Sequence, residues 1–390
     1  MNTEHDSGTR RRGLRGDGGG DRHGTGSGLR GHRGAGRTRT GWAWRTVLAL
    51  GGVVTLGACS ATGGAPRSTP GGEGGGTVDT PRMTVAMVSH GAPGDTFWDL
   101  VRKGAEDAAR KDNVELRYSS DPQAPNQANL VQNAVDSRVD GIAVTMPTPD
   151  AIGPAVQRAV DAGVTVVGLN AGMDQYRRYG MSGFFGQEEG VAGEQAGRRL
   201  AADGATKALC VIHEQGNSSQ EARCAGLRKG LAAGAGERAT GGNGNGGGAS
   251  GGSRAGGTVE TLYVNGQDLT AVQSTVQAKP AQDRGIDWVV GLVAPVALTA
   301  VSAARDAGSS AKIATFDTNA ELVAAIRKGD VQWAVDQQPY LQGYLAVDAL
   351  WLARRNGSTV GGGRPVYTGP SFVDADTVDT IADAAKEGLR

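Results

Sequence analysis

The sequence predicts an α/β protein with two lobes, each built on a parallel sheet covered by helices. Three observations predict this fold class. Short apolar strands alternate with amphipathic helices from residue 83 to about residue 355, a pattern typical of parallel sheets with helices on both faces. The number of these units is too large for one sheet. Outside two glycine-rich segments, about 280 residues remain, enough for two hydrophobic cores.

The elements are expected in a regular order. Short runs rich in apolar residues predict strands, and stretches with apolar residues at helical spacing predict helices. The expected strands are 85–88, 114–116, 141–144, 164–169, 208–212, 259–264, 287–290, 312–316 and 331–335. The expected helices are 97–109, 129–137, 151–162, 191–202, 221–233, 271–282, 295–307, 320–328 and 341–354. Ligands of such sheets bind at the carboxyl ends of the strands, so we expect the site there.

Glycine is concentrated in two segments. The chain has 65 glycines, of which 23 lie in residues 1–82 and 12 in residues 234–257. The second segment lies between a helix and a strand, so it predicts a disordered surface insertion at 234–257 within the second lobe.

The first 58 residues predict an export signal with a long basic head. Residues 1–45 carry ten Arg, no Lys and four acidic residues, a net charge of +6 that leaves −6 for the rest of a neutral chain. A mildly acidic body is a poor nucleic-acid binder. Residues 46–58 are uncharged and mostly apolar, too short to span a bilayer but typical of a signal peptide. Residues 59–82 are rich in Gly, Pro, Ser and Thr and predict a flexible tether.

The residues before the tether resemble a lipoprotein cleavage site. Leu56-Gly57-Ala58-Cys59 is similar to the lipobox of bacterial lipoproteins, in which the Cys receives a lipid and becomes the first residue after cleavage. The resemblance implies lipidation of Cys59 and an anchor on the outer face of the cytoplasmic membrane. The alternative is a chance Cys behind a buried apolar helix.

The two other cysteines, Cys210 and Cys224, are expected to pair. An exported protein meets oxidising conditions. Cys210 lies about 10 Å below the end of its strand, and Cys224 lies about 7 Å below the start of the next helix, which runs back down. These similar depths favour a disulfide, and two buried free thiols are the alternative.

The motifs for common catalytic and cofactor sites are missing from the sequence. No G-x-G-x-x-G follows a strand, and neither G-x-x-x-x-G-K-[ST] nor H-E-x-x-H occurs. Three of the five His lie in the N-terminal head, which leaves His90 and His213 in the body. We therefore expect a binding protein and not an enzyme, with no cofactor and no metal.

Five sequence features resemble the ribose-type periplasmic sugar-binding proteins. They span residues 83 to about 355 and occur in the order found in that family. They are Val85-Ala86-Met87-Val88 followed by Phe97-Trp98 and Gly104-Ala105, Val139-Asp140-Gly141-Ile142-Ala143-Val144, Val164-Thr165-Val166-Val167-Gly168-Leu169-Asn170, Ala314-Thr315-Phe316-Asp317, and Asp336-Gln337-Gln338-Pro339 with Gly343. The strand end 291–295 and the loop 91–96 depart from the family pattern.

The resemblance implies a type I periplasmic-binding-protein fold with two Rossmann-like lobes. The first lobe would comprise residues 83–186 and 338–366, and the second residues 187–337 and 367–390. Such a protein would bind a small sugar or polyol in the cleft between the lobes by lobe closure. It would act as an extracytoplasmic monomer that delivers its ligand to an ABC permease. An ATPase would be its partner indirectly, through the permease.

Three other functions share some of these features. A receptor for a sugar-like signal that feeds a sensor kinase has the same fold. A regulator of the lactose-repressor type needs a helix-turn-helix head, which the Gly/Arg-rich residues 1–45 cannot form. A hydrolase tethered outside the cell is the third alternative.

Eight residues are expected to bind the ligand. A polyol needs carboxylates, amides and Arg for its hydroxyls and an aromatic ring for its C–H face. The candidates are Phe97, Trp98, Asn170, Arg223, Asp317, Gln337, His90 and Asp95. Six of them have a structural alternative: the aromatic pair as helix core, Asn170 as a turn cap, Arg223 as a surface residue, Asp317 as the cap of the next helix, and Gln337 as a hinge residue.

Overall fold

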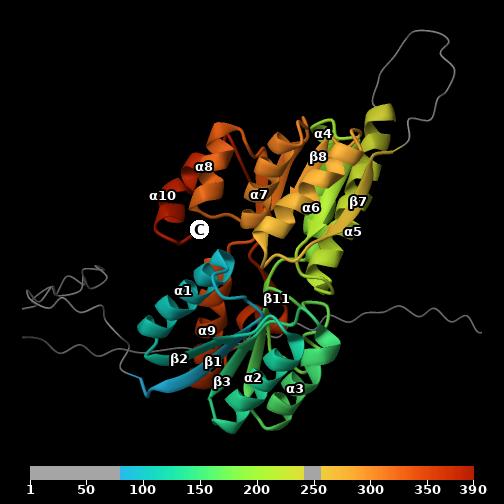
Figure 1. Cartoon of the computed structure of the whole chain (residues 1–390). Coiled ribbons are helices and arrows are strands. Elements are labelled where there is room, and N and C mark those ends of the chain that lie inside the picture. Colours follow the sequence, from blue (N-terminus) through green and yellow to red (C-terminus); the bar gives the residue numbers. More distant parts are fainter. Residues whose placement is uncertain (1–79, 241–255) are drawn as a thin grey trace, which may run out of the picture. The chain divides into compact units, whose positions relative to one another are not determined.

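Two six-stranded sheets, each covered by helices, make up the described part of the chain (Figure 1). The computed structural model describes residues 80–240 and 256–390, which lie within one compact unit of the chain. This arrangement confirms the predicted α/β fold with two lobes. The expectations for the signal peptide, for Cys59 and for most of the tether fall on residues 1–79, outside the described residues.

The first lobe is built on a fully parallel sheet with the strand order β11-β5-β4-β3-β1-β2. Helices α1 and α9 pack together on one face, and α2 and α3 pack together on the other (Figure 1). The strands are β1 (Met83–Ser89), β2 (Val114–Ser120), β3 (Gly141–Val144), β4 (Thr165–Leu169), β5 (Phe184–Gly186) and β11 (Pro365–Tyr367). The helices are α1 (Thr96–Lys111), α2 (Ala124–Asp136), α3 (Pro149–Asp161) and α9 (Pro339–Asn356), with a 3-10 turn at Val360–Gly363.

The second lobe has the strand order β12-β10-β9-β8-β6-β7, and only the β10–β12 pair is antiparallel. Helices α4 and α5 pair on one face, and α6 pairs with α7 on the other. The strands are β6 (Lys207–Ile212), β7 (Thr258–Tyr263), β8 (Trp288–Gly291), β9 (Lys312–Phe316), β10 (Trp333–Asp336) and β12 (Ser371–Asp374). The helices are α4 (Glu189–Ala202), α5 (Ser218–Thr240), α6 (Leu269–Gln282), α7 (Ala294–Asp306), α8 (Ala320–Lys328) and α10 (Ala382–Lys386), with a 3-10 turn at Val378–Thr380.

Strand β6 shows why the predicted strands are continuous apolar runs. Leu209 and Val211 belong to the core under α6 and α7, whereas Cys210 and Ile212 belong to the core under α4 and α5. Successive side chains of a strand point to opposite faces, so a strand buried on both sides needs an apolar residue at every position.

Glycines allow helices α4 and α5 to cross in close contact. A Cβ atom built at Gly193 of α4 would lie 2.3 Å from the carbonyl oxygen of Arg223, and one built at Gly230 of α5 would lie 2.0 Å from the carbonyl oxygen of Glu194. Any larger residue would push the two backbones apart. The close crossing therefore fixes the position of Arg223, on α5, relative to the start of α4.

Within residues 80–240 and 256–390, the chain passes between the sheets three times. The passages follow β5, β10 and β11, at residues 187–188, 337–338 and 368–370. Strand β11 includes Tyr367, so the first sheet extends one residue beyond the lobe limit expected at 366.

The expected insertion at 234–257 needs a correction. Helix α5 continues to Thr240, so residues 234–240 are helical and not part of a disordered loop. The run Ala-Gly-Ala-Gly-Glu-Arg-Ala-Thr contains no Pro and several good helix formers, which extend the helix past its two glycines. Residues 241–255 lie outside the described residues. Within the described ranges, no helix has both the length and the apolar character needed to cross a bilayer.

Candidate functional site

Two polar residues follow buried strands at the edges where the sheets approach each other. Asn170 follows β4 and Asp317 follows β9, and both adopt the left-handed conformation with φ of 62° and 65°. Asn and Asp tolerate this region better than other non-glycine residues. Both residues are almost fully buried. The sharp turn after each strand holds its polar side chain in the space between the lobes.

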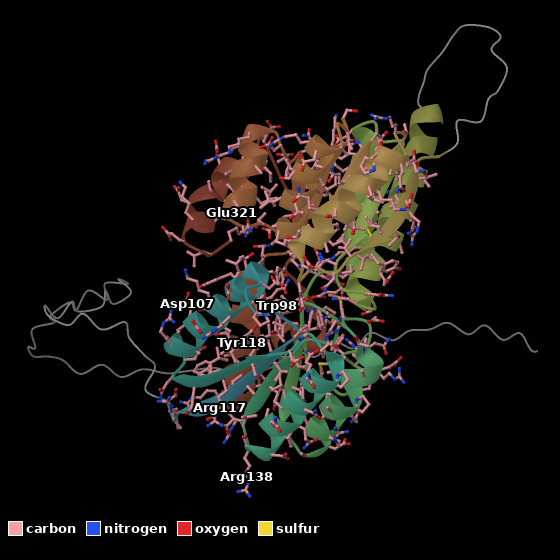
Figure 2. All side chains as sticks on the ribbon, in the orientation of Figure 1. Trp98, Asp107, Arg117, Tyr118, Arg138 and Glu321 are labelled. Atoms are coloured by element: carbon pink, nitrogen blue, oxygen red, sulfur yellow. A yellow bond between two sulfur atoms is a disulfide. The ribbon has the colours of Figure 1, made fainter. Side chains whose placement is uncertain are left out.

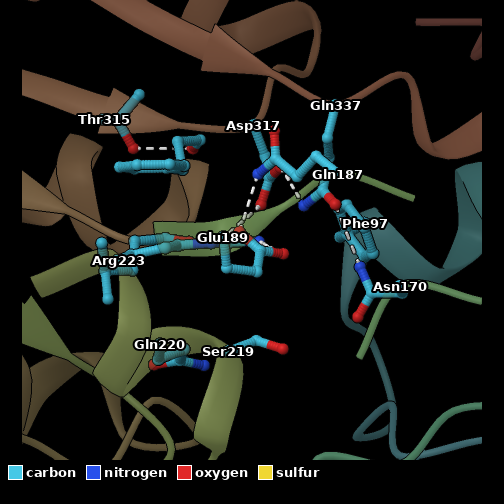
Figure 3. A network of polar contacts seen from close by, with 12 residues as sticks. Phe97, Asn170, Gln187, Glu189, Ser219, Gln220, Arg223, Thr315, Asp317 and Gln337 are labelled. Atoms are coloured by element: carbon cyan, nitrogen blue, oxygen red, sulfur yellow. Dashed lines mark hydrogen bonds and ion pairs between the residues drawn. The ribbon is translucent and has the colours of Figure 1, made fainter. Parts of the chain in front are cut away.

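Gln337 connects these two strand ends across a passage between the lobes (Figure 3). Its Nε2 donates a hydrogen bond of 2.7 Å to Oδ1 of Asp317, and its Oε1 accepts one of 3.2 Å from Nδ2 of Asn170. Gln342 of α9 also donates from Nε2 to the same Oε1 at 2.9 Å. Gln337 therefore bonds to residues of both lobes.

Arg223 and Glu189 form a buried ion pair beside this network (Figure 3). The Nε and Nη2 atoms of Arg223 donate to the two carboxylate oxygens of Glu189 at 2.6 and 2.9 Å, and the side chains are 5% and 8% exposed. The guanidinium lies 4.8 Å from the ring centroid of Phe316, and its Nη1 lies 4.0 Å from Oδ2 of Asp317. Burial alone would lower the pKa of Arg223, but attraction and hydrogen bonds from Glu189 raise it. Arg223 therefore stays charged.

The first lobe contributes an aromatic wall. The rings of Phe97 and Trp98 meet edge to face with centroids 5.1 Å apart, and Trp98 meets His90 in the same way at 4.7 Å. Trp98 lies on the side of its lobe that faces the second lobe, whereas Arg117 and Arg138 lie on the outer surface (Figure 2). A Cβ at Gly91 would lie 2.5 Å from the indole of Trp98, so glycine is needed for Trp98 to pack here.

Asp95 has two roles in this wall. It is the N-cap of α1, where its Oδ1 accepts a hydrogen bond of 3.0 Å from the backbone N–H of Phe97. It also lines the space between the lobes. Burial raises its pKa to about 6.

Burial shifts the pKa of three further groups in opposite directions according to their charge. It lowers the pKa of His90 to about 3, with help from the positive charge of Arg223, and the pKa of His213 to about 4. It raises the pKa of Asp317 to about 7, and Arg223 offsets only part of this effect. Desolvation disfavours whichever form is charged. Near neutral pH both imidazoles are uncharged, and Asp317 is close to its titration midpoint.

Neutral His90 can both donate and accept a hydrogen bond. Its Nδ1 lies 2.7 Å from Oγ1 of Thr145 within its own lobe. Its Nε2 lies 3.7 Å from Oε2 of Glu214 and 3.5 Å from Nδ2 of Asn217, both in the second lobe. The backbone N–H of Ser218 also donates to the carbonyl of Pro147 at 2.9 Å. The two lobes are therefore in direct contact around the site.

All eight predicted residues line one cavity between the lobes. These are His90, Asp95, Phe97, Trp98, Asn170, Arg223, Asp317 and Gln337. The free volume of this cavity is small, about 30 Å³. The alternative that Asp317 caps a helix is wrong, because Asn319 caps α8 by accepting from the N–H of Leu322 at 2.8 Å. Asp317 does not cap α8, and its Oδ1 accepts a hydrogen bond from Gln337 instead.

The eight predicted residues leave out part of the opposite wall. His213, Glu214, Asn217, Ser219, Gln220 and Val293 also line the cavity. Strand β6 ends at Ile212, so His213 and Glu214 follow a strand end in the same way as Asn170 and Asp317. The same rule applied to every strand would have found them. Asn217 and Gln220 lie around the start of α5, and Asn217 accepts from the N–H of Ser219 at 3.0 Å.

The expected disulfide is present. Cys210 of β6 and Cys224 of α5 are bonded, with their Cα atoms 5.9 Å apart. The bond ties the residue next to Arg223 to the sheet.

A comparison with protein families identifies the fold. A profile described as the periplasmic binding protein domain matches residues 85–357, more than two thirds of the chain. This chain belongs to the periplasmic binding protein family. Membership confirms the predicted resemblance, and it implies an extracytoplasmic location for this periplasmic binding protein. Its relatives are sugar-binding proteins of transporters and not enzymes, as predicted.

Individual relatives agree with this family. The periplasmic binding protein is 47% identical to a carbohydrate transporter protein from Acidothermus cellulolyticus solved with myo-inositol, over 80% of this chain and 100% of that one, with a TM-score of 0.73. It is 24% identical to the xylose/arabinose-binding protein of Sulfolobus acidocaldarius over 77% of this chain and 73% of the relative. A ribose ABC transporter protein from Conexibacter woesei shares the fold, with 21% identity over 81% of this chain and 99% of that one and a TM-score of 0.62.

Proposed function

We propose that this protein is the lipid-anchored substrate-binding subunit of an ABC importer and that its ligand is a small cyclic polyol of the myo-inositol class. The observation that carries the proposal is the set of buried polar side chains where the strand ends of both sheets meet. Asp317 accepts, Arg223 donates, and Asn170 and Gln337 do both. A ring that carries a hydroxyl on every carbon offers both kinds of partner to all of them.

The aromatic wall supports the same class of ligand. Phe97 and Trp98 line the cavity, and the C–H groups of a polyol ring pack on aromatic surfaces. Buried donors and acceptors that lose a partner cost about 1–3 kcal/mol each. A site of this kind therefore rejects rings with misplaced hydroxyls.

The relative at 47% identity favours a cyclitol over a pentose or a hexose. That protein was solved with myo-inositol, and the other sugar-binding relatives share far less sequence with this chain. Transport is the proposed use of the site because the relatives are described as transporter proteins.

Ligand entry requires the lobes to separate. The cavity of about 30 Å³ holds one or two waters, whereas a cavity of about 150 Å³ is needed for a six-membered ring such as benzene. Opening breaks the bonds that Gln337 makes to both lobes and the contacts of His90 with the second lobe. Closure on the ligand then replaces them with hydrogen bonds to ring hydroxyls.

Titration calorimetry on the purified full-length protein tests the proposal. The panel comprises myo-inositol, scyllo-inositol, ribose, arabinose, galactose and glucose. We expect myo-inositol to bind most tightly. At a pH above 7, where Asp317 is mostly charged, Asp317→Ala should weaken its binding by roughly 10- to 150-fold, because a hydrogen bond to a charged group contributes about 1.5–3 kcal/mol. Binding of a pentose or hexose in preference to both inositols would refute the cyclitol assignment but leave the family role intact.

A further inference from the structure

A second, larger cavity opens beside the central one. Its volume is about 260 Å³, compared with about 30 Å³ for the space around Asp317 and Arg223. Asn170 of the first lobe and Ser219 of the second line both spaces. The two cavities are therefore neighbours, and these two side chains belong to the wall that they share. We call the larger one the side cavity.

The side cavity is large enough for a second ring. A cavity of about 150 Å³ accommodates benzene, so about 260 Å³ holds a hexose ring with ordered water. Nothing in the binding of a single cyclitol at the central site uses this volume.

The wall of the side cavity has the chemistry of a sugar subsite. Met173 and Ala222 supply apolar surface for C–H groups. Ser218 and Ser219 lie at the start of α5, and within the described residues neither hydroxyl makes a hydrogen bond. These hydroxyls are free to donate to a ligand oxygen or to accept from a ligand hydroxyl.

The charges on the wall select against anions. Asp174 and Glu188 line the side cavity, and no Lys or Arg among the described residues does so. Both oxygens of Glu188 accept from backbone N–H groups of Gly190 and Val191 at the start of α4, so this carboxylate is held in place. A third carboxylate of the wall, that of Glu189, is already paired with Arg223. A phosphate or a uronate would therefore face the carboxylates of Asp174 and Glu188 with no unpaired cation among the described residues that line the cavity.

We propose that the site takes a polyol that carries a neutral glycosyl substituent, with the cyclitol ring in the central cavity and the second ring in the side cavity. This inference rests on the proposed function, because it assigns the first ring to the central site. The bond between the rings would pass between Asn170 and Ser219.

Calorimetry with three ligands tests the inference on the full-length protein. The ligands are myo-inositol, an α-galactoside of myo-inositol and myo-inositol 1-phosphate. We expect the galactoside to bind at least as tightly as myo-inositol, and the phosphate at least about tenfold more weakly, which corresponds to 1.4 kcal/mol. A protein that binds myo-inositol but not the galactoside overturns this inference alone. A protein that binds neither overturns the proposed cyclitol function as well.

A cavity-filling variant separates the two spaces. Ala222→Phe places a ring in the side cavity from α5, and Ala225→Phe adds the same ring on the exposed side of the same helix as a control. We expect Ala222→Phe to weaken the galactoside by at least about tenfold and myo-inositol by less than threefold, with no effect of Ala225→Phe. Equal losses for both ligands would overturn the assignment. If melting shows that Ala222→Phe is unfolded, Ala222→Leu makes the same comparison with a smaller side chain.

Discussion

Replacement of Arg223 should reveal how strongly the site depends on its buried ion pair. The Arg223→Met variant keeps a long side chain over Phe316 but removes both hydrogen bonds to Glu189. The carboxylate of Glu189 would then be 8% exposed without a cation. Its one other side-chain partner is Nε2 of Gln187 at 2.9 Å.

The expected loss of stability is large. The loss of one partner of a buried pair typically costs about 3–5 kcal/mol, because an uncompensated charge stays buried. Domains of this kind are stable by about 5–15 kcal/mol. The variant should therefore lose a large share of its free energy of unfolding and still fold.

A double variant identifies the cause. Replacement of a whole buried ion pair by apolar residues of similar volume is often neutral or stabilising. Arg223→Met combined with Glu189→Met should therefore recover most of the stability lost by Arg223→Met. Affinity for the ligand should stay low in both variants, because both lack the guanidinium donors.

Urea unfolding followed by tryptophan fluorescence measures these changes, provided that the m-values stay equal. Arg228→Met is the matched control on the same helix, because Arg228 is exposed, and it should change stability by less than about 0.5 kcal/mol. The reasoning fails if Arg223→Met costs less than about 1 kcal/mol, or if the double variant is as unstable as the single one.

Three further predictions concern pH, packing and the anchor. The pKa of Asp317 is raised from 3.8 to about 7. Between these two values the native state binds more protons than the unfolded state, so the wild type loses stability as pH rises. The free energy of unfolding of Asp317→Asn, measured relative to the wild type by urea unfolding, should therefore grow from pH 4.5 to pH 7, and a constant difference would contradict the raised pKa. Gly193→Ala should cost about 1–3 kcal/mol and weaken ligand binding in calorimetry, because its Cβ would lie 2.3 Å from the carbonyl oxygen of Arg223; Val191→Ala, at an exposed position of the same helix, is the control and should do neither. Cys59→Ser should move the protein from the membrane to the soluble fraction of cells, and a variant that still pellets with membranes would disprove the lipid anchor.

The sequence predicted the long elements well because their burial pattern is simple. Each strand of the sheet centres, such as β9 at Lys312–Phe316, reads as an apolar run, and the flanking helices show apolar positions at helical spacing. The start of α2 was expected at 129 and lies five residues earlier, at Ala124, one residue before Pro125. It lies in the first turn of the helix, where Pro is well tolerated.

The short edge strands were not predictable in the same way. β5 (Phe184–Gly186), β11 (Pro365–Tyr367) and β12 (Ser371–Asp374) have three or four residues each. Such segments carry too few positions for a period, and their extended form depends on pairing with strands that are distant in the sequence. The ion pair between Glu189 and Arg223 was not predictable for a similar reason. Nothing local in the sequence indicates that Glu189, at the start of α4, bonds to Arg223 in α5.

The restraints on the cleft residues differ, and this difference indicates which residues would change their contacts when a ligand binds. Arg223 is held by Glu189, by the close crossing at Gly193 and by the disulfide of its neighbour Cys224. Asn170 and Asp317 are fixed by the left-handed turns that end their strands. Residues fixed before binding lose little conformational entropy when the ligand arrives, which favours affinity.

Gln337 differs from Arg223, Asn170 and Asp317 because it bonds to residues of both lobes. It lies at a passage between the sheets and bonds to Asn170, Asp317 and Gln342. These bonds cannot all persist when the lobes separate, since Asn170 and Asp317 then move apart. A ligand that offers hydroxyls to Asn170 and Asp317 can replace Gln337 as their partner only in the closed form. Under the proposed function, closure is coupled to occupancy through the amide of Gln337, whereas Arg223, Asn170 and Asp317 are held by their own lobes.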